Sequence, residues 1–272
     1  MDATDGPRIV QLGVNDAADG LLLSTEAHWN QTADDWRIFL RDGVVYGIHD
    51  GRQLVATAAL LPYSGSNAWI SMVLVTASHR RRGLATRLVD ACLDTARKRG
   101  LTSWLDATPA GATVYGPLGF TPTLQLRRLR LAKATAVAPP PVTATIAALC
   151  ARDAQAAGFD RTALLTAFAQ RPGSSVVSAN GALALVRDGR TARHVGPLFA
   201  GDAAAALTLI NAIARSENSP ILIDAVASQG AFLEGLTASG WTIERPFQRM
   251  RFGSATATAA ELPFAVAGPE FG

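Results

Sequence analysis

The chain has 272 residues, of which 49% are hydrophobic and 17% are charged, and its formal net charge is +3. The length allows two modest domains, and the composition is typical of a soluble globular protein. The small net charge argues against nucleic acid as a partner. No apolar run reaches the roughly 18 residues that span a bilayer, and the first residues are acidic where a secretory signal would be basic. We therefore expect a cytoplasmic protein that does not bind a membrane.

The first part of the chain predicts a mixed α/β sheet in the order β–α–α–β–β–β–α–β–α–β. Helices are expected at 17–28, at 34–40 with Thr32 as the N-cap, and at 110–118. Apolar residues at helical spacing predict a further helix from Leu84 to the cationic turn before Gly100. Strands are expected at 8–12, 44–49, 53–61, 67–76, 102–106 and 125–131. The dipeptide Asp50-Gly51 predicts a hairpin between the second and third strands. The strand at 67–76 is apolar almost throughout, so it should be central in the sheet.

The stretch 133–143 contains consecutive prolines among small residues and predicts an extended linker. After it, helices are expected at 145–156, 161–169, 202–215 and 229–239, and strands at 174–178, 182–187, 193–199, 220–226 and 241–252. This order repeats the hairpin–strand–helix–strand–helix–strand order of the first part. We therefore predict two structurally related domains, at 1–132 and 144–253. Residues 254–272 are rich in Ala, Thr, Pro and Gly and predict a loose tail.

The segment 70–86, ISMVLVTASHRRRGLAT, has the pattern of an anion-binding site. An apolar strand leads into a basic loop, and the loop leads directly into a helix. The amides of a first helical turn have no intrahelical acceptor and carry the positive end of the helix dipole. Gly83 and Ala85 are small enough for a ligand to approach the backbone, and the arginines before Gly83 add positive charge. The sequence therefore predicts a cradle for a diphosphate.

The order Arg80-x-x-Gly83-x-Ala85 resembles the R/Q-x-x-G-x-G/A acyl-CoA pyrophosphate motif of the GNAT superfamily of N-acetyltransferases. The resemblance covers nearly the whole first domain. Asp106-Ala-Thr-Pro-Ala-Gly111 stands where the next strand of that fold ends, and Tyr115-Gly-Pro-Leu-Gly-Phe120 resembles the family's Y-x-x-x-G-F ending. The resemblance implies tandem GNAT-like domains, each with a mostly antiparallel sheet and a central pair of splayed parallel strands.

The same resemblance implies that acetyl-CoA, or another acyl-CoA, is the cofactor. The splayed strand would bind the pantetheine arm, and an amine would attack the thioester carbonyl directly. Tyr115 would be the general acid for the leaving thiolate, since a phenol with a pKa of about 10 is protonated at neutral pH, although it could instead be a packing residue. The implied cofactor-binding residues are Val73, Leu74, Val75, Arg80, Arg81, Arg82, Gly83, Leu84, Ala85, Thr86, Thr108 and Gly111.

The general base has two candidates. Asp106 stands at a strand end and Glu26 lies within the helix expected at 17–28, and either could instead be a capping or surface carboxylate. His79, beside the basic loop, is interpreted as a solvated loop residue. Cys92 and Cys150 lack the spacing of a metal site, so no metal is expected.

A second resemblance is to two-domain GNAT proteins. It rests on Trp29-Asn-Gln-Thr32, Asp35-Trp36, Gly158-Phe-Asp-Arg161, His194-Val-Gly-Pro197, Leu222-Ile-Asp224 and Arg245-Pro-Phe-Gln-Arg-Met250. The second domain lacks the phosphate motif, so it should cover the acceptor pocket rather than bind acyl-CoA. The implied acceptor-site residues, each of which could also be structural, are Glu26, Trp29, Asn30, Gln31, Trp36, Asp224 and Arg249.

We therefore expect an N-acetyltransferase that moves an acetyl or other acyl group from acetyl-CoA to a primary amine of a small molecule in a ternary complex. Either a monomer or a homodimer is compatible with the sequence. The alternative function is a non-catalytic acyl-CoA sensor or regulatory module. A dinucleotide-binding Rossmann domain is excluded because no G-x-G-x-x-G follows the first strand.

Overall fold

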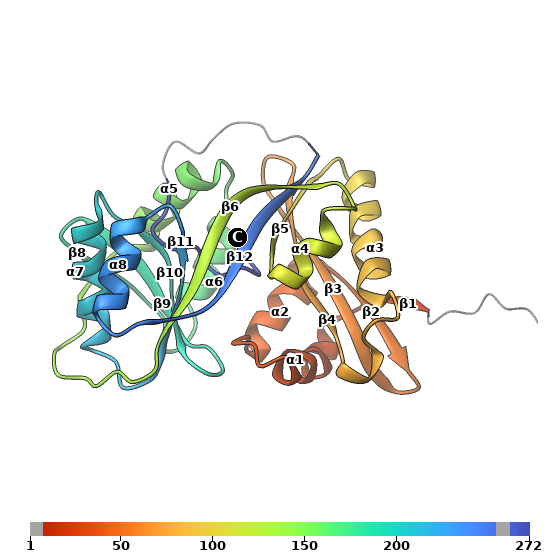
Figure 1. The fold of residues 1–272 in the computed structure, drawn as a ribbon, viewed down its shortest axis with the longest axis horizontal. Coiled ribbons are helices and arrows are strands. Elements are labelled where there is room, and N and C mark those ends of the chain that lie inside the picture. The colour runs from red at the N-terminus through yellow and green to blue at the C-terminus, as the bar shows by residue number, and fades with distance from the viewer. Residues whose placement is uncertain (1–7, 254–261) are drawn as a thin grey trace, which may run out of the picture. The chain divides into compact units, whose positions relative to one another are not determined.

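The computed structural model describes residues 8–253 and 262–272 of the chain (Figure 1). The chain divides into two compact units, Met1–Leu105 and Asp106–Gly272. Each unit contains a run of adjacent, hydrogen-bonded strands with helices packed against them. Within the described ranges, no helix has both the length and the apolar character that crossing a bilayer requires.

The sheet of the first unit has the strand order β1-β2-β3-β4-β5. All neighbours in it are antiparallel except β4 and β5, which are parallel. Its strands are β1 (Ile9–Leu12), β2 (Val44–Asp50), β3 (Gln53–Tyr63), β4 (Asn67–Val75) and β5 (Thr102–Ala107), of which the last two residues belong to the second unit. Its helices are η1 (Val14–Asp16), α1 (Ala17–Glu26), α2 (Ala33–Asp42), η2 (Ala77–His79) and α3 (Leu84–Lys98).

Helices α1 and α2 pack through one tryptophan. Thr32 begins α2 as the predicted N-cap, because its hydroxyl accepts from the Asp35 amide at 3.3 Å while the Asp35 carboxylate accepts from the Thr32 amide at 2.8 Å. The capped helix buries Trp36, whose indole N–H donates to the Ser24 hydroxyl at 3.1 Å. Gly20 allows this packing, since a Cβ there would lie 2.6 Å from the ring.

Strand β4 is bent by a bulge at Met72. The φ of Met72 is 51°, in the left-handed region, and the register with β3 shifts between Thr57 and Ala59. The Thr57 hydroxyl donates to the Met72 carbonyl at 2.8 Å inside the core. This buried hydrogen bond fixes a backbone conformation that a non-glycine residue rarely adopts. The bulge therefore redirects the second half of β4.

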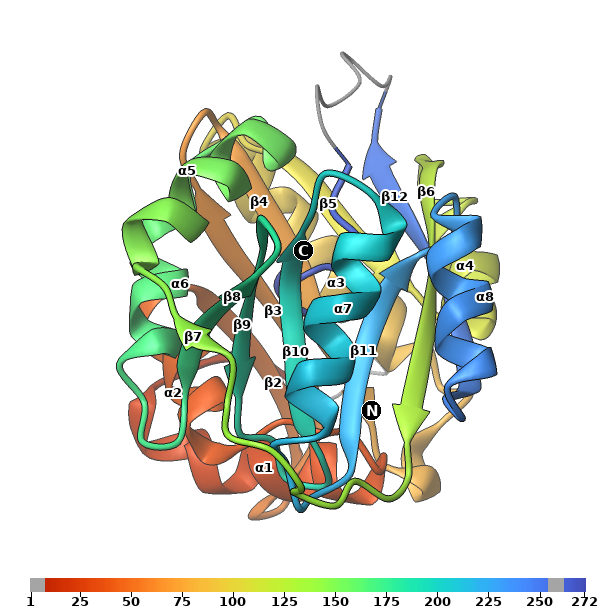
Figure 2. The same cartoon turned by 90° about the vertical axis from the view of Figure 1, so that its left-hand side faces the viewer.

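The sheet of the second unit has the order β12-β6-β11-β10-β9-β8-β7. Helices α7 and α8 cover one of its faces (Figure 2). Its strands are β6 (Phe120–Leu131), β7 (Val142–Thr143), β8 (Ser175–Ala179), β9 (Ala182–Arg187), β10 (Arg193–Phe199), β11 (Ile221–Val226) and β12 (Thr242–Phe252). Its helices are α4 (Pro109–Tyr115), α5 (Ile146–Ala157), α6 (Thr162–Ala169), α7 (Ala203–Ala214) and α8 (Gly230–Ala238).

The element order confirms the internal repeat. In the first part of the chain the order is β3, β4, α3, β5, α4, β6, and in the second part it is β9, β10, α7, β11, α8, β12. In both copies the first two strands are antiparallel and the next pair is parallel. The compact units nevertheless divide at residue 105, because β6 pairs along its length with β12 and β11. The domain boundary at 132 therefore stays a prediction.

The predicted loose tail is wrong for residues 262–272, while 254–261 lie outside the described residues. Phe264 and Phe271 are 5% and 0% exposed. The Phe264 ring lies edge-on to Phe232 at 5.3 Å, and the Phe271 ring lies edge-on to Phe168 at 4.8 Å. Small and flexible residue types suggested a tail, but these two aromatic anchors hold the segment in the core of the second unit.

The linker 133–143 is extended up to the short strand β7, and it is tied to the second unit. The Val137 and Ala138 amides both donate to the Arg215 carbonyl, at 2.8 and 3.1 Å. Ala134 is buried in the hydrophobic core beside α7 and β10. The proline-rich stretch thus lies along the second unit instead of standing free of it.

Candidate functional site

The loop between β4 and α3 presents bare amides at a helix start. Gly83 precedes α3 with a φ of 73°, and the first amide with an acceptor in the helix is that of Arg87, which donates to the Gly83 carbonyl at 3.1 Å. Among the described residues, none accepts a hydrogen bond from the amides of Leu84, Ala85 or Thr86. These donors lie at the positive end of the α3 dipole, which suits an anion.

Gly83 adopts a left-handed backbone conformation that favours glycine, and its lack of a side chain leaves space for a ligand. A Cβ at Gly83 would meet no atom within 4 Å, so the position is open on its outer side. The arginines beside it are exposed, and two are tied to the loop backbone by one N–H each. Arg80 donates to the Val75 carbonyl at 3.2 Å, and Arg82 donates to the Ser78 carbonyl at 2.9 Å. Each guanidinium keeps further N–H groups that could bind a phosphate.

Strands β4 and β5 pair over only part of their length. The parallel ladder joins 67–69 to 102–104, whereas β4 continues to Val75. Beyond Trp69, none of the described strands pairs with β4 on the side away from β3. An unpaired strand edge offers backbone donors and acceptors to an extended ligand. Val73, Leu74 and Val75 lie on this stretch, next to the loop with the bare amides.

Glu26 lies at the end of α1 and holds the start of the basic loop. Its carboxylate accepts from the Ala77 amide at 2.7 Å, and the side chain is exposed. His79, in the same loop, contacts the Asp50 carboxylate through Nε2 at 3.1 Å. Asp50, at the end of β2, therefore holds the His79 side chain, while the role of Glu26 as base stays a prediction.

Three of the predicted acceptor-site residues in and before α2 are buried. Trp36 is 0% exposed and packed between Gly20 and Phe39, so its observed role is packing and its place in the acceptor site stays a prediction. Asn30 and Gln31 are 6% and 3% exposed, and Trp29 is half-buried. Oε1 of Gln31 has no hydrogen-bond partner among the described residues. A buried acceptor without a partner is unusual, and a ligand that donates a hydrogen bond would satisfy it.

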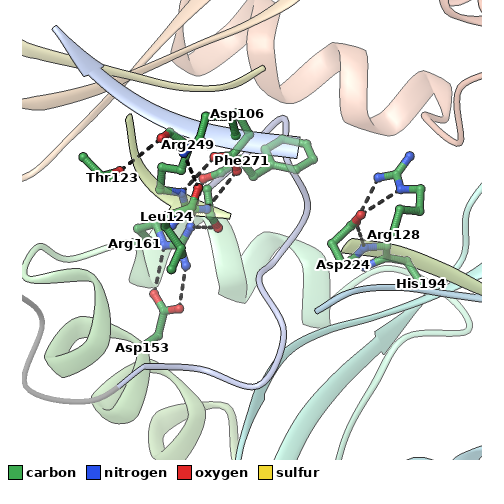
Figure 3. A network of polar contacts seen from close by, with 12 residues as sticks. Asp106, Thr123, Leu124, Arg128, Asp153, Arg161, His194, Asp224, Arg249 and Phe271 are labelled. Atoms are coloured by element: carbon green, nitrogen blue, oxygen red, sulfur yellow. Dashed lines mark hydrogen bonds and ion pairs between the residues drawn. The ribbon is translucent and has the colours of Figure 1, made fainter. Parts of the chain in front are cut away.

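Asp224, also predicted at the acceptor site, belongs to a buried ion network (Figure 3). Its carboxylate accepts from Arg128 Nε at 2.7 Å and Arg128 Nη2 at 2.8 Å, and it contacts His194 Nε2 at 3.0 Å. Asp224 is 0% exposed. Burial would raise the pKa of this carboxyl, but the Arg128 guanidinium and the His194 hydrogen bond outweigh burial and hold it well below its usual range. These partners enclose the Asp224 carboxylate, so its observed role is structural and its contact with an acceptor stays a prediction.

His194 gives the second unit a predicted pH dependence of stability. Burial, helped by the Arg187 cation, lowers the pKa of His194 to about 4 from 6.5, despite the opposing effect of Asp224. The folded state therefore binds fewer protons than the unfolded state between these values, so stability is lost as the pH falls from about 6.5 to about 4, by about 3 kcal/mol. Urea titrations across this range should show a weaker dependence in His194→Gln, and an equal dependence in both proteins would contradict the assignment.

Asp106 and Arg249, predicted as a base and as an acceptor contact, are partners of each other (Figure 3). Arg249 donates from Nε to Oδ1 and from Nη2 to Oδ2, both at 2.8 Å. The Asp106 side chain is 0% exposed and that of Arg249 is 17% exposed. Burial raises the pKa of the Asp106 carboxyl, whereas the Arg249 guanidinium lowers it. A general-base role for Asp106 does not fit this geometry, because both oxygens are occupied by Arg249.

Tyr115 lies in the last turn of α4, within the second unit. It is 9% exposed, and its ring centroid is 6.0 Å from that of Phe120. Thr108 caps this helix by accepting from the Gly111 amide at 3.2 Å. A Cβ at Gly111 would lie 3.0 Å from the Tyr115 ring, so glycine here makes room for the tyrosine. The observed roles of Thr108 and Gly111 are capping and close packing, and their contact with a cofactor stays a prediction.

The sequence analysis missed most of the buried ion pairs. Arg161 donates to the Asp153 carboxylate at 3.0 and 2.6 Å, and Arg128 and His194 join Asp224. The available signal was a single charged residue within an apolar strand, as in Leu222-Ile-Asp224. Across the described part of the chain, no cluster of His, Cys, Asp or Glu could hold a metal ion.

Comparison with known protein families gives two matches. The model described as "Acetyltransferase (GNAT) family" matches residues 17–120, and the one described as "Acetyltransferase (GNAT) domain" matches residues 149–264. Together they cover most of the chain, one on each copy of the repeat. A search of curated proteins finds no significant match.

Solved structures share the fold at low sequence identity. A putative acetyltransferase from Pyrococcus horikoshii is 20% identical, with a TM-score of 0.81, over 99% of this chain and 97% of that one. A tandem GNAT protein from the clavulanic acid biosynthesis pathway is 16% identical, with a TM-score of 0.64, over 93% and 100% of the two chains. A GCN5-related N-acetyltransferase from Sphaerobacter thermophilus is 14% identical, with a TM-score of 0.61, over 92% and 98%.

Proposed function

Since this chain belongs to the GNAT family of acetyltransferases and is therefore an acyltransferase, we propose that it transfers an acetyl group from acetyl-CoA to a primary amine of a small molecule. Acyl-CoA as the donor is what membership of the family implies. The choice of acetyl, the small-molecule acceptor and the ternary complex are the specific parts of the proposal. They rest on the sequence resemblance and on the groups that the first unit presents.

One observation carries the donor assignment: an unpaired strand edge lies directly before a helix start with bare amides. In this proposal the diphosphate binds the amides of Leu84, Ala85 and Thr86, with Arg80, Arg81 and Arg82 around it. The pantetheine arm lies along the open edge formed by Val73, Leu74 and Val75, where amide groups can pair with it as a strand would. A long, thin ligand with an anionic end fits both features.

The chemistry needs two proton transfers and one bond exchange. The amine nitrogen forms a bond to the thioester carbonyl carbon, and the carbon–sulfur bond breaks to release the thiolate. Tyr115 gives its phenolic proton to that thiolate, and a base removes the proton that the amine loses. With Asp106 held by Arg249, Glu26 is the remaining carboxylate candidate for that base, directly or through water.

The acceptor is assigned to the α1–α2 connection. Among its residues, Gln31 has the most specific feature, because its buried Oε1 lacks a partner within the described structure. Such an oxygen would accept a hydrogen bond from an ammonium or hydroxyl group of the acceptor. Trp29 and Asn30 directly precede it in the chain, and the partly exposed Arg249 is the remaining acceptor candidate.

Release of free thiol from acetyl-CoA, measured with a panel of small primary amines, tests this function. Amine-dependent thiol release with a matching acetylated product is expected. If acetyl-CoA binds but no amine in the panel gives turnover, the sensor function is favoured. If acetyl-CoA does not bind, the donor site itself is refuted.

Replacing Tyr115 with phenylalanine should lower kcat about a hundredfold, because the thiolate then leaves without a positioned acid. The ring is kept, so the packing on Phe120 and the affinity for acetyl-CoA should change little. Steady-state kinetics with calorimetric measurement of acetyl-CoA binding separates the two effects. Full activity in this variant would remove Tyr115 from the mechanism.

A further inference from the structure

The second unit contains a gap between parallel strands like the one in the first unit. Strands β10 and β11 pair only over 193–195 and 221–223, although β10 continues to Phe199 and β11 to Val226. A register shift interrupts β10 between Val195 and Leu198, as the bulge at Met72 interrupts β4. The repeat therefore reproduces the geometry that the proposed function assigns to the pantetheine arm.

In the second unit this gap is filled by the chain itself. The Leu198 amide donates to the Ala265 carbonyl at 2.9 Å, and the Phe264 amide donates to the Leu198 carbonyl at 2.8 Å. On the other side, the Val226 amide donates to the Phe264 carbonyl and the Val266 amide donates to the Asp224 carbonyl, both at 3.0 Å. Residues 264–266 thus bond to both strands and satisfy the backbone groups that a bound arm would use.

Side chains and one glycine are adapted to this segment. A Cβ at Gly196 would lie 2.0 Å from the Val266 carbonyl oxygen, so no other residue fits while the segment is in place. Arg161 donates to the Phe271 carbonyl at 2.9 Å, and Arg187 donates to the Ala267 carbonyl at 2.8 Å. Both guanidinium groups are buried, which makes them parts of a built site for the segment.

The phosphate end of the second gap is filled as well. Asp202 precedes α7 as Gly83 precedes α3, and its carboxylate accepts from the Ala205 amide at 2.8 Å. The Asp202 carboxylate therefore accepts a hydrogen bond from one of the amides that an anionic ligand would need, and its negative charge repels a phosphate. The arginine run before Gly83 has no counterpart here, since Pro197, Leu198 and Phe199 precede Ala200-Gly201.

We propose that residues 264–266 occupy the second unit as a built-in substitute for the acyl-CoA arm, so that each chain binds one acyl-CoA, in its first unit. The inference rests on the proposed function for its ligand, but the closed gap is a property of the second unit alone. The second domain lacks the phosphate motif, and the closed gap adds a physical reason why it would not bind acyl-CoA. Protein groups occupy both ends of the site.

Calorimetry and native mass spectrometry of the full chain with acetyl-CoA test the stoichiometry. One ligand per chain is expected, lost in Gly83→Glu and retained in Gly201→Glu with a Kd within about twofold. Gly201 is a matched control, since it lies in the corresponding loop and a Cβ there would also meet nothing within 4 Å. Two ligands per chain, or one that Gly201→Glu removes while Gly83→Glu does not, would overturn the proposal.

Hydrogen exchange tests the closed gap independently of any ligand. The amides of Leu198, Val226, Phe264 and Val266 should be protected like those of the central strands, with and without acetyl-CoA. Rapid exchange at these amides would overturn the proposal. Failure of acetyl-CoA to bind, with these amides protected, would refute the donor site in the first unit and leave the filled gap in the second unit supported.

Discussion

Replacing Gly83 with glutamate is expected to raise the Kd for acetyl-CoA at least about a hundredfold. The new carboxylate would lie at the start of α3, where the amides of Leu84, Ala85 and Thr86 are bare, and would compete with the diphosphate for them. Loss of two charge-assisted hydrogen bonds, at about 1.5 kcal/mol or more each, corresponds to this factor. Calorimetric titration of the variant with acetyl-CoA measures it.

A second variant separates charge from backbone strain. Gly83 has a φ of 73°, which any side chain makes less favourable, so Gly83→Ala carries the strain without the charge. The alanine variant should retain binding with a smaller loss of affinity, because a Cβ meets no atom there. Affinity unchanged in the glutamate variant would refute the anion site. An equal loss in both would show that loop conformation, and not the anion site, is what the substitution disturbs.

Replacing Asp224 with alanine is expected to destabilise the second unit by about 3–5 kcal/mol. Arg128 would then be a buried cation, 4% exposed, without its bidentate partner, and His194 would lose the carboxylate that its Nε2 contacts. The register explains the pairing, since Asp224 of β11 lies directly opposite Arg128 of β6. Urea unfolding followed by a probe in the second unit measures the loss.

The matched control is Glu244→Ala on β12. Glu244 pairs with Arg130 of β6, but both side chains are partly exposed, so this substitution should cost less than about 1 kcal/mol. If Asp224→Ala is no more destabilising than Glu244→Ala, the buried network does not stabilise the unit. An acceptor role for Asp224 would instead predict changed acceptor KM at unchanged stability.

Most of the fold was predictable because its signals are local. Neighbouring residues set three of these signals: the apolar period of α3, the Thr32 cap of α2 and the Asp50-Gly51 turn. The structure confirms each of them. The basic loop was predictable for the same reason. Gly83, the preceding strand and the following helix are contiguous, so the sequence alone places bare amides beside arginines.

The buried charges were not predictable, because their environment depends on strand register. Asp224 stands at a strand end in the sequence, where a functional carboxylate is common, but β6 places Arg128 beside it from far along the chain. The same holds for Asp106 and Arg249, which are brought together by the sheet. For Trp36, the deciding feature was the small residue Gly20 on another helix, which allows full burial.

The segment that fills the gap between β10 and β11 was not predicted, for a different reason. Residues 262–272 have the composition of a tail, and nothing local marks them as a segment that bridges β10 and β11. The signal lies elsewhere, in Gly196 and in the arginines that bind the segment. The composition of a segment indicates whether it would be ordered in isolation. Its place in the fold also depends on the residues elsewhere in the chain that bind it.

The position of β6 has a consequence for biosynthesis. Both of its neighbours, β11 and β12, come later in the chain, and β6 runs beside β12 over most of its length (Figure 1). At typical ribosomal rates the nascent β6 waits on the order of ten seconds with two unpaired edges. Its closely spaced arginines, Arg127, Arg128 and Arg130, would repel other nascent strands during that time. β6 therefore gains both of its neighbours only after β12 has been synthesised.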